Sequence, residues 1–246
     1  MAPLSSVGFE PPPDFPGTVH DRIHRRLAPL ANTEKHGRTW RQFGLAWAAV
    51  AYRFQACADY DAAFRKLFDQ LGSNTTGFDR YRQQRDLYGC VVSACSAIES
   101  FYYATYAVGA LADSVAFPIS TPHAQRDITP VATVRRFRQR YPDDVVVSVL
   151  GAVVGDPQWA GLCDLRNVLV HRAAPAKTVG VHLAPGMGAV TSPARLALSD
   201  FHLPDRGFDP QLTKACRNWV AGALDALCDG LDGFTKRHQI ELAANR

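Results

Sequence analysis

The sequence predicts an all-α protein whose core is a four-helix, up-and-down bundle. Two long segments, over residues 40–71 and 79–111, repeat apolar side chains every three or four positions, which is the period of an amphipathic helix. Two further helical segments each follow an Asp-Pro pair, and a capping Asp before a first-turn Pro is a signature of a helix start. Hydrophobic residues make up 47% of the 246 residues, so one chain can bury a helical core.

The first 37 residues predict an N-terminal arm, and residues 38–246 predict a single bundle domain. Residues 1–17 are rich in Pro and Gly, and a short basic helix is expected over 21–30. The first long helix follows and ends at the Gly-Ser-Asn sequence of residues 72–74. Its apolar positions are Trp40, Phe43, Trp47, Val50, Phe54, Cys57, Phe64, Leu67 and Leu71.

The second long helix has two stripes, which predicts burial on two sides. One stripe consists of Leu87, Val91, Ala94, Ile98, Phe101, Thr105 and Val108, and the other of Tyr88, Val92, Cys95, Glu99, Tyr102 and Tyr106. Glu99 needs a partner in such a stripe, because an unpaired buried carboxylate is costly. Either it forms a salt bridge that fixes helix packing, or it orients charged groups on the third long helix.

Residues 114–155 are predicted to be a helical insertion. A Pro-containing connection over 114–128 leads to Thr129-Pro130, whose cap and first-turn proline predict a helix start. That helix carries four arginines before Pro142 stops it, namely Arg135, Arg136, Arg138 and Arg140. These cations could contact a nucleic-acid backbone weakly, or they could form a solvated face. For residues 143–155 the pattern leaves helix and strand open.

The third long helix is predicted to start near Asp156-Pro157 and to run to about residue 173. The following residues, 174–206, are rich in Pro and Gly. They predict a loop or a small hairpin with strands over 179–183 and 190–198.

The fourth long helix follows Asp209-Pro210. Its apolar face consists of Leu212, Cys216, Trp219, Ala223, Leu227, Leu231 and Phe234. Three aspartates also align on this helix, Asp225, Asp229 and Asp232, and we interpret them as a solvated face because no His or Glu joins them at a metal-binding spacing.

Composition and cysteine usage indicate a cytoplasmic protein without a cofactor. A net charge of +4 permits an anionic partner without requiring one, and we interpret the excess of Arg (22) over Lys (5) as GC-rich coding. The six cysteines form no Cys-x-x-Cys pair, so we expect reduced, packed thiols and no metal site. No signal peptide is visible, and the longest apolar stretch, 145–154, is too short for a bilayer, so no membrane partner is expected.

The most informative stretch is residues 166–171, Arg-Asn-Val-Leu-Val-His, on the third long helix. Asn167 and His171 are four apart and share a helix face, which Asp164 extends. The other side carries Leu162, Leu165 and Leu169, which are available for burial. The polar flank is therefore expected to face a cleft, a partner or water, and to handle phosphate.

The spacing of Arg and His alone is a weak signal. With 22 Arg and 8 His, about two cases of Arg followed by His after four to six residues are expected by chance. The sequence contains two, Arg166/His171 and Arg195/His202. The second lies among prolines in a predicted loop and is discounted.

Through Leu165–His171 the chain resembles the HEPN superfamily, whose helical bundles commonly carry Arg, four to six residues and His, often with a polar residue after the Arg. The bundle pattern extends the resemblance to residues 38–113 and 156–240. Two features depart from the family: Ala173 stands where some members have Tyr, and the insertion has no counterpart that we can match.

The resemblance implies a metal-independent endoribonuclease that acts on RNA in a cleft between two identical protomers. It also implies a toxin or phage-defence setting with an antitoxin or defence-system partner. Arg166 would neutralise the scissile phosphate, His171 would transfer the proton at the ribose 2′-hydroxyl or the leaving oxygen, and Asn167 would orient one of them. Asp164 and Glu99 are the expected supporting residues.

The chemistry of the two charged side chains supports the same assignment. An imidazole can give or take a proton near neutral pH, and a guanidinium forks onto phosphate oxygens. On one helix, Arg166 and His171 lie about 140° apart around the axis, so two opposed copies suit one phosphate better than one copy does. The alternative is a non-catalytic helical module for protein interaction or ligand binding, in which Arg166 pairs with Asp164 or Glu99.

Overall fold

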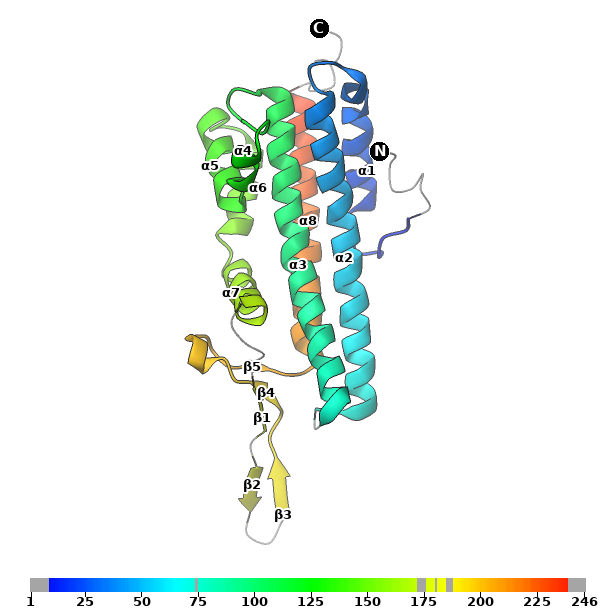
Figure 1. The fold of residues 1–246 in the computed structure, drawn as a ribbon, viewed down its shortest axis with the longest axis vertical. Helices are drawn as coiled ribbons and strands as arrows, with labels where there is room; N and C mark the ends of the chain where they lie inside the picture. The colour runs from blue at the N-terminus through cyan, green and yellow to red at the C-terminus, as the bar shows by residue number, and fades with distance from the viewer. Residues whose placement is uncertain (1–8, 74, 172–175, 180, 185–187, 239–246) are drawn as a thin grey trace. The chain divides into compact units, whose positions relative to one another are not determined.

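The structure is a computed structural model that describes residues 9–73, 75–171, 176–179, 181–184 and 188–238 (Figure 1). Helices make up most of these residues, which confirms the predicted helical character. The α-helices in this part of the chain are α1 (Gly17–Leu27), α2 (Gly37–Leu71), α3 (Gly77–Ala112), α4 (Pro122–Arg126), α5 (Pro130–Arg140), α6 (Val145–Val154), α7 (Pro157–His171) and α8 (Pro210–Arg237). Short 3-10 helices are η2 (Ala28–Asn32) and η3 (Ser199–Phe201). The strands are β1 (Lys177–Thr178), β2 (Val181–Ala184), β3 (Gly188–Thr191), β4 (Arg195–Leu196) and β5 (Arg206–Gly207).

The four long helices expected from periodicity are present as α2, α3, α7 and α8. Gly72 ends α2 with a φ of +66°, in the left-handed region that glycine adopts without strain. Its N–H donates to the carbonyl of Phe68 at 2.7 Å and so closes the last turn. Some predictions also cover residues 1–8, Asn74, 172–175, Gly180, 185–187 and 239–246, which lie outside the described residues.

The short basic helix lies earlier than predicted. Helix α1 begins at Gly17 and ends at Leu27, whereas the sequence favoured residues 21–30. Pro29 has no backbone N–H with which to continue the α-helical pattern, and the chain proceeds as the 3-10 helix η2 instead.

The insertion is helical, and its ends follow local capping chemistry. The Thr129 hydroxyl accepts a hydrogen bond from the backbone N–H of Ala132 at 3.1 Å and starts α5, as predicted. Residues 143–155, for which the sequence left helix and strand open, contain the helix α6. The Asp144 carboxylate caps its start by accepting from the N–H of Val146 at 2.9 Å. The connection before α5 contains the five-residue helix α4, which the sequence analysis did not predict.

The Pro/Gly-rich excursion forms two small antiparallel sheets. Strands β2 and β3 form a two-stranded hairpin in which Val181 pairs with Thr191, and the other sheet has the strand order β1-β4-β5 (Figure 1). The predicted strand over 190–198 is therefore divided between β3 and β4. Pro193 lies at the division and has no N–H to donate to a ladder.

The described chain divides into two compact units, and each is described by itself. The first unit contains Met1–Gln55, Ser96–Trp159 and Val220–Arg246, and the second contains Ala56–Cys95 and Ala160–Trp219. Helices α2, α3, α7 and α8 each contribute residues to both units. The proposed single domain over 38–246 stays a prediction.

The core of the first unit is aromatic. The ring of His20 stacks on Trp47 with centroids 4.4 Å apart, and Trp47 also packs against Phe101. The Nε2 of His20 lies 2.9 Å from the carbonyl of Trp47, and the Trp47 indole N–H donates to the carbonyl of His20 at 3.1 Å. These paired contacts hold α1 alongside the first half of α2 (Figure 1).

The prediction that the three aspartates of α8 form one solvated face is wrong for Asp232. Asp225 and Asp229 are exposed, but Asp232 is buried. Its carboxylate pairs with Arg22 at 3.0 Å and with Arg26 at 2.6 Å, both on α1. Burial is tolerable because these guanidinium groups compensate the charge.

In the second unit, Phe208, which follows β5, packs against the distal half of α2. Phe64 meets Phe208 edge to face, with ring centroids 5.4 Å apart. Gly89 allows a close approach between α3 and α2, because a Cβ there would lie 2.7 Å from the ring of Tyr60. A larger side chain at Gly89 would therefore have to displace that ring.

Among the described residues, no single helix is long and apolar enough to cross a membrane. The adjoining helices α6 and α7 reach the required length and hydropathy only when they are taken together.

Candidate functional site

Helix α7 buries one flank and leaves the other accessible. Its first turn is capped by Asp156, whose carboxylate accepts from the N–H of Gln158 at 2.7 Å. Leu162 and Leu165 are buried as predicted, and Val168 is buried with them. Leu169 is only half-buried, so the apolar flank is rotated slightly from the one expected.

The motif residues lie on the accessible flank or at its edge. Asp164 and His171 are exposed, whereas Arg166 and Asn167 are half-buried. His171 is the last residue of α7. This arrangement leaves an imidazole available to a ligand and holds the neighbouring amide and guanidinium partly in the protein.

Arg166 lies close to the α3 segment of the second unit. A hydrogen bond with Cys163 and burial raise the pKa of Cys95, and the positive charge of Arg166 opposes that rise. The Cys95 thiol is 3.7 Å from the carbonyl of Leu162, which fixes the packing of α7 on α3 in this unit. Arg166 therefore lies beside a packed helix pair, whereas His171 is exposed at the end of α7.

Glu99 belongs to the first unit and is half-buried. It lines a cavity of about 470 Å³ together with Arg53, Ser100 and Tyr103. The Arg53 guanidinium donates to the carbonyl of Ser96 at 3.1 Å and to the Ser100 hydroxyl. The expectation that Glu99 orients Arg166 or His171 concerns residues of the other unit and stays a prediction.

The four arginines of α5 do not form one surface. Arg140 pairs with Asp113 at 2.7 Å, and Arg138 extends over Gly151 of α6. Arg135 and Arg136 instead line a cavity of about 610 Å³ in the first unit. Of the four arginines predicted to contact nucleic acid, only Arg135 and Arg136 therefore line one pocket.

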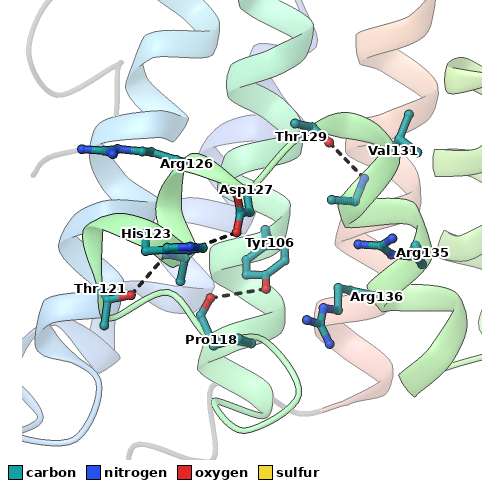
Figure 2. Close-up of a pocket in the computed structure, with 12 residues that line it drawn as sticks. Tyr106, Pro118, Thr121, His123, Arg126, Asp127, Thr129, Val131, Arg135 and Arg136 are labelled. Carbon is teal, nitrogen blue, oxygen red and sulfur yellow. Dashed lines mark hydrogen bonds and ion pairs between the residues drawn. The ribbon is translucent and has the colours of Figure 1, made fainter.

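This arginine-lined cavity is formed by α3, α4 and α5 (Figure 2). Figure 2 shows the α5 side chains on one side of Tyr106 and the α4 side chains on the other. Its charged and titratable residues are Tyr106, His123, Arg126, Asp127, Arg135 and Arg136.

The cavity has more positive than negative groups. Its lining contains three arginines and one acidic residue, Asp127, whose carboxylate lies 3.2 Å from His123. Burial raises the pKa of Tyr106, and Arg136 opposes that rise from close by. An excess of arginine in a cavity of this size suits an anionic ligand such as a phosphate ester.

The α4 half of this cavity was not predicted from the sequence. A signal was present, because Thr121-Pro122 repeats the Thr-Pro signature that correctly predicted α5. The Thr121 hydroxyl indeed accepts from the N–H of Ala124 at 3.2 Å. A predicted helix at α4 would have placed Arg126 on a helix next to the one that carries Arg135, and both residues line this cavity.

Three cysteines converge in the second unit, which their spacing in the sequence does not reveal. The Sγ atoms of Cys57, Cys90 and Cys216 all lie within 4.8 Å of one another. Each comes from a different helix, so the absence of a Cys-x-x-Cys pair does not exclude a site for a metal ion. Among the described residues, this is the group of side chains with the spacing of metal ligands.

Comparisons of the chain with family models, with curated proteins and with solved structures found no match.

Proposed function

We propose that this chain is a metal-independent endoribonuclease of the HEPN type that works at the cleft of a homodimer. The accessible polar flank of α7 is the observation that carries the proposal. Asp164 and His171 are exposed on it, Arg166 and Asn167 are half-buried beside them, and the opposite flank is buried. A helix that served only to fill a core would have little reason to carry this set of polar groups.

The proposed reaction needs a base and an acid on opposite sides of one phosphate. One copy of His171 takes the proton of the ribose 2′-hydroxyl, whose oxygen attacks the phosphorus. The second copy gives a proton to the 5′-oxygen as its bond to phosphorus breaks, which leaves a 2′,3′-cyclic phosphate and a 5′-hydroxyl. Arg166 stabilises the charge that develops on the phosphate oxygens, and Asn167 orients them.

The test is cleavage of single-stranded RNA in EDTA by the wild type and by His171→Asn. We expect the wild type to leave 2′,3′-cyclic phosphate ends. We expect the variant to be slower by about 10² to 10⁴-fold, because proton transfer contributes that much to such reactions. The rate is measured by gel or mass spectrometry on an end-labelled oligonucleotide.

The matched control is His202→Asn. His202 belongs to the other Arg-to-His match, and its partner Arg195 lies on β4 rather than on an α-helix. Its φ is +60°, a conformation that Asn tolerates, so the same substitution is suitable there. Two results would refute the proposal. One is an equal rate of cleavage by His171→Asn and by the wild type, and the other is no cleavage by a folded wild type.

A second candidate function is the binding of a phosphate-bearing ligand in the arginine-lined cavity. The observation in its favour is the excess of arginine over acidic residues in the lining of this one cavity. It corresponds to a non-catalytic module that binds a ligand.

This function is tested by titrating the protein with AMP in a calorimeter. Arg135→Gln/Arg136→Gln is expected to weaken binding about ten-fold or more, because it removes two charged donors from the cavity. The control is Arg138→Gln/Arg140→Gln, which makes the same change of charge on the same helix but outside the lining residues. Equal weakening by both pairs would contradict a specific cavity site.

A further inference from the structure

Three thiols meet inside the second unit, one from each of three helices. Cys57 lies on α2, Cys90 on α3 and Cys216 on α8. The first two are fully buried, and Cys216 is 9% exposed. The Sγ atoms of Cys57 and Cys90 are 3.6 Å apart, and all three sulfurs lie within 4.8 Å of one another.

These distances suit coordination to one metal ion. Zinc binds thiolates at about 2.3 Å, so tetrahedral geometry places two sulfurs roughly 3.8 Å apart. The observed separations need to change by no more than about an ångström to reach that value, which side-chain rotation can provide. A disulfide, by contrast, needs its two sulfurs about 2.05 Å apart.

A buried carboxylate stands one helical turn from the cluster. Asp61 follows Cys57 by four residues on α2 and is 1% exposed. Its Oδ2 lies 3.1 Å from Arg65 and 3.6 Å from Arg217, but its Oδ1 has no hydrogen-bond partner among the described residues. A buried acceptor without a partner is costly, and the positive charge of a metal ion bound by the neighbouring thiols would offset part of that cost.

We propose that Cys57, Cys90 and Cys216 bind a structural zinc ion through their three thiolates, with the buried carboxylate of Asp61 as a neighbouring negative charge. Thiolates are donors that Zn²⁺ accepts. Binding deprotonates the thiols and releases their protons to solvent. The ion would join α2, α3 and α8 within the second unit, so its role is separate from the proposed cleavage of RNA.

The charges around the cluster support a divalent ion. Three thiolates, the Asp61 carboxylate and Zn²⁺ sum to −2, and the guanidinium groups of Arg65 and Arg217 supply +2.

The full-length protein, produced with zinc and kept reduced, is analysed for metal after desalting. About one zinc per chain is expected by mass spectrometry of the elements. Replacement of zinc by Co²⁺ is expected to give the strong absorption of thiolate bound to cobalt. This spectrum reports thiolate ligands directly, so it tests the site even where a cysteine variant fails to fold.

Two variants make the assignment specific. Cys216→Ala removes one ligand, whereas the matched control Cys228→Ala removes another buried cysteine of α8 that lies in the first unit. We expect loss of zinc from the former only. Asp61→Asn keeps all three thiolates and is expected to weaken zinc binding about ten-fold or more.

Three results would overturn the proposal. The first is a folded, reduced wild type that takes up no zinc from an excess of the ion. The second is equal zinc content in Cys216→Ala and the wild type. The third is a mass two units below the fully reduced value in protein kept with reductant, which would show a disulfide within the cluster instead.

Discussion

His20 is the residue whose protonation is most clearly tied to folding. Its side chain stacks on the ring of Trp47 and is hydrogen-bonded to the backbone carbonyl of Trp47, and the residue is 2% exposed. Burial lowers its pKa from the usual value of 6.5 to about 4, although the hydrogen bond to Trp47 opposes that change. The folded protein therefore keeps the ring neutral at a pH where the unfolded chain would protonate it.

This shift predicts that the protein loses stability in mild acid. Between pH 6.5 and pH 4 the unfolded state binds the extra proton, so the free energy of unfolding falls as pH falls. From the pKa of about 4, the loss attributable to His20 between pH 7 and pH 5 is about 2 kcal/mol. Urea unfolding at the two pH values measures it, and His24, whose pKa burial also lowers, adds a loss of the same sign.

His20→Gln removes the titrating group and should reduce the difference between the two pH values. The control is His123→Gln, because that side chain is 89% exposed. If His20→Gln kept the full pH dependence of the wild type, the lowered pKa of His20 would not be its cause.

At the scale of the element, the sequence predicted what local chemistry decides. Helix α5 starts where Thr129-Pro130 indicated, and α2 ends at Gly72, because a cap, a first-turn proline and a left-handed glycine act within a few residues. Helix α4 has the same Thr-Pro start but only five residues, too few to show an apolar period. Its omission hid half of the arginine-lined cavity.

Features that depend on distant segments could not be read from the sequence. Asp232 is buried because Arg22 and Arg26, more than 200 positions earlier, compensate its charge. Cys57 and Cys216 are brought together by the packing of separate helices. In α7, by contrast, periodicity alone predicted the burial of Leu165 and the accessibility of His171, since both follow from position around one helix.

At the scale of the whole molecule, the proposed site needs a second copy of the chain. Arg166 lies beside α3, and His171 is exposed at the end of α7, about 140° further around the axis. One helix does not aim both groups at one phosphate, and one imidazole cannot serve as base and acid on opposite sides of it. Two chains related by a two-fold axis would supply a second imidazole opposite the first.

If two copies of His171 share one cleft, activity depends on the fraction of wild-type chains in a characteristic way. Wild-type protein is mixed with His171→Asn, the subunits are allowed to exchange, and exchange is verified by capture through a tag on one of the two chains. If both copies of His171 are needed, only dimers of two wild-type chains cleave RNA, and an equal mixture retains about a quarter of the activity. If each chain acts alone, the same mixture retains about half. A linear dependence on the wild-type fraction, in a sample shown to be dimeric, would contradict the shared cleft while leaving each copy of α7 as a complete site.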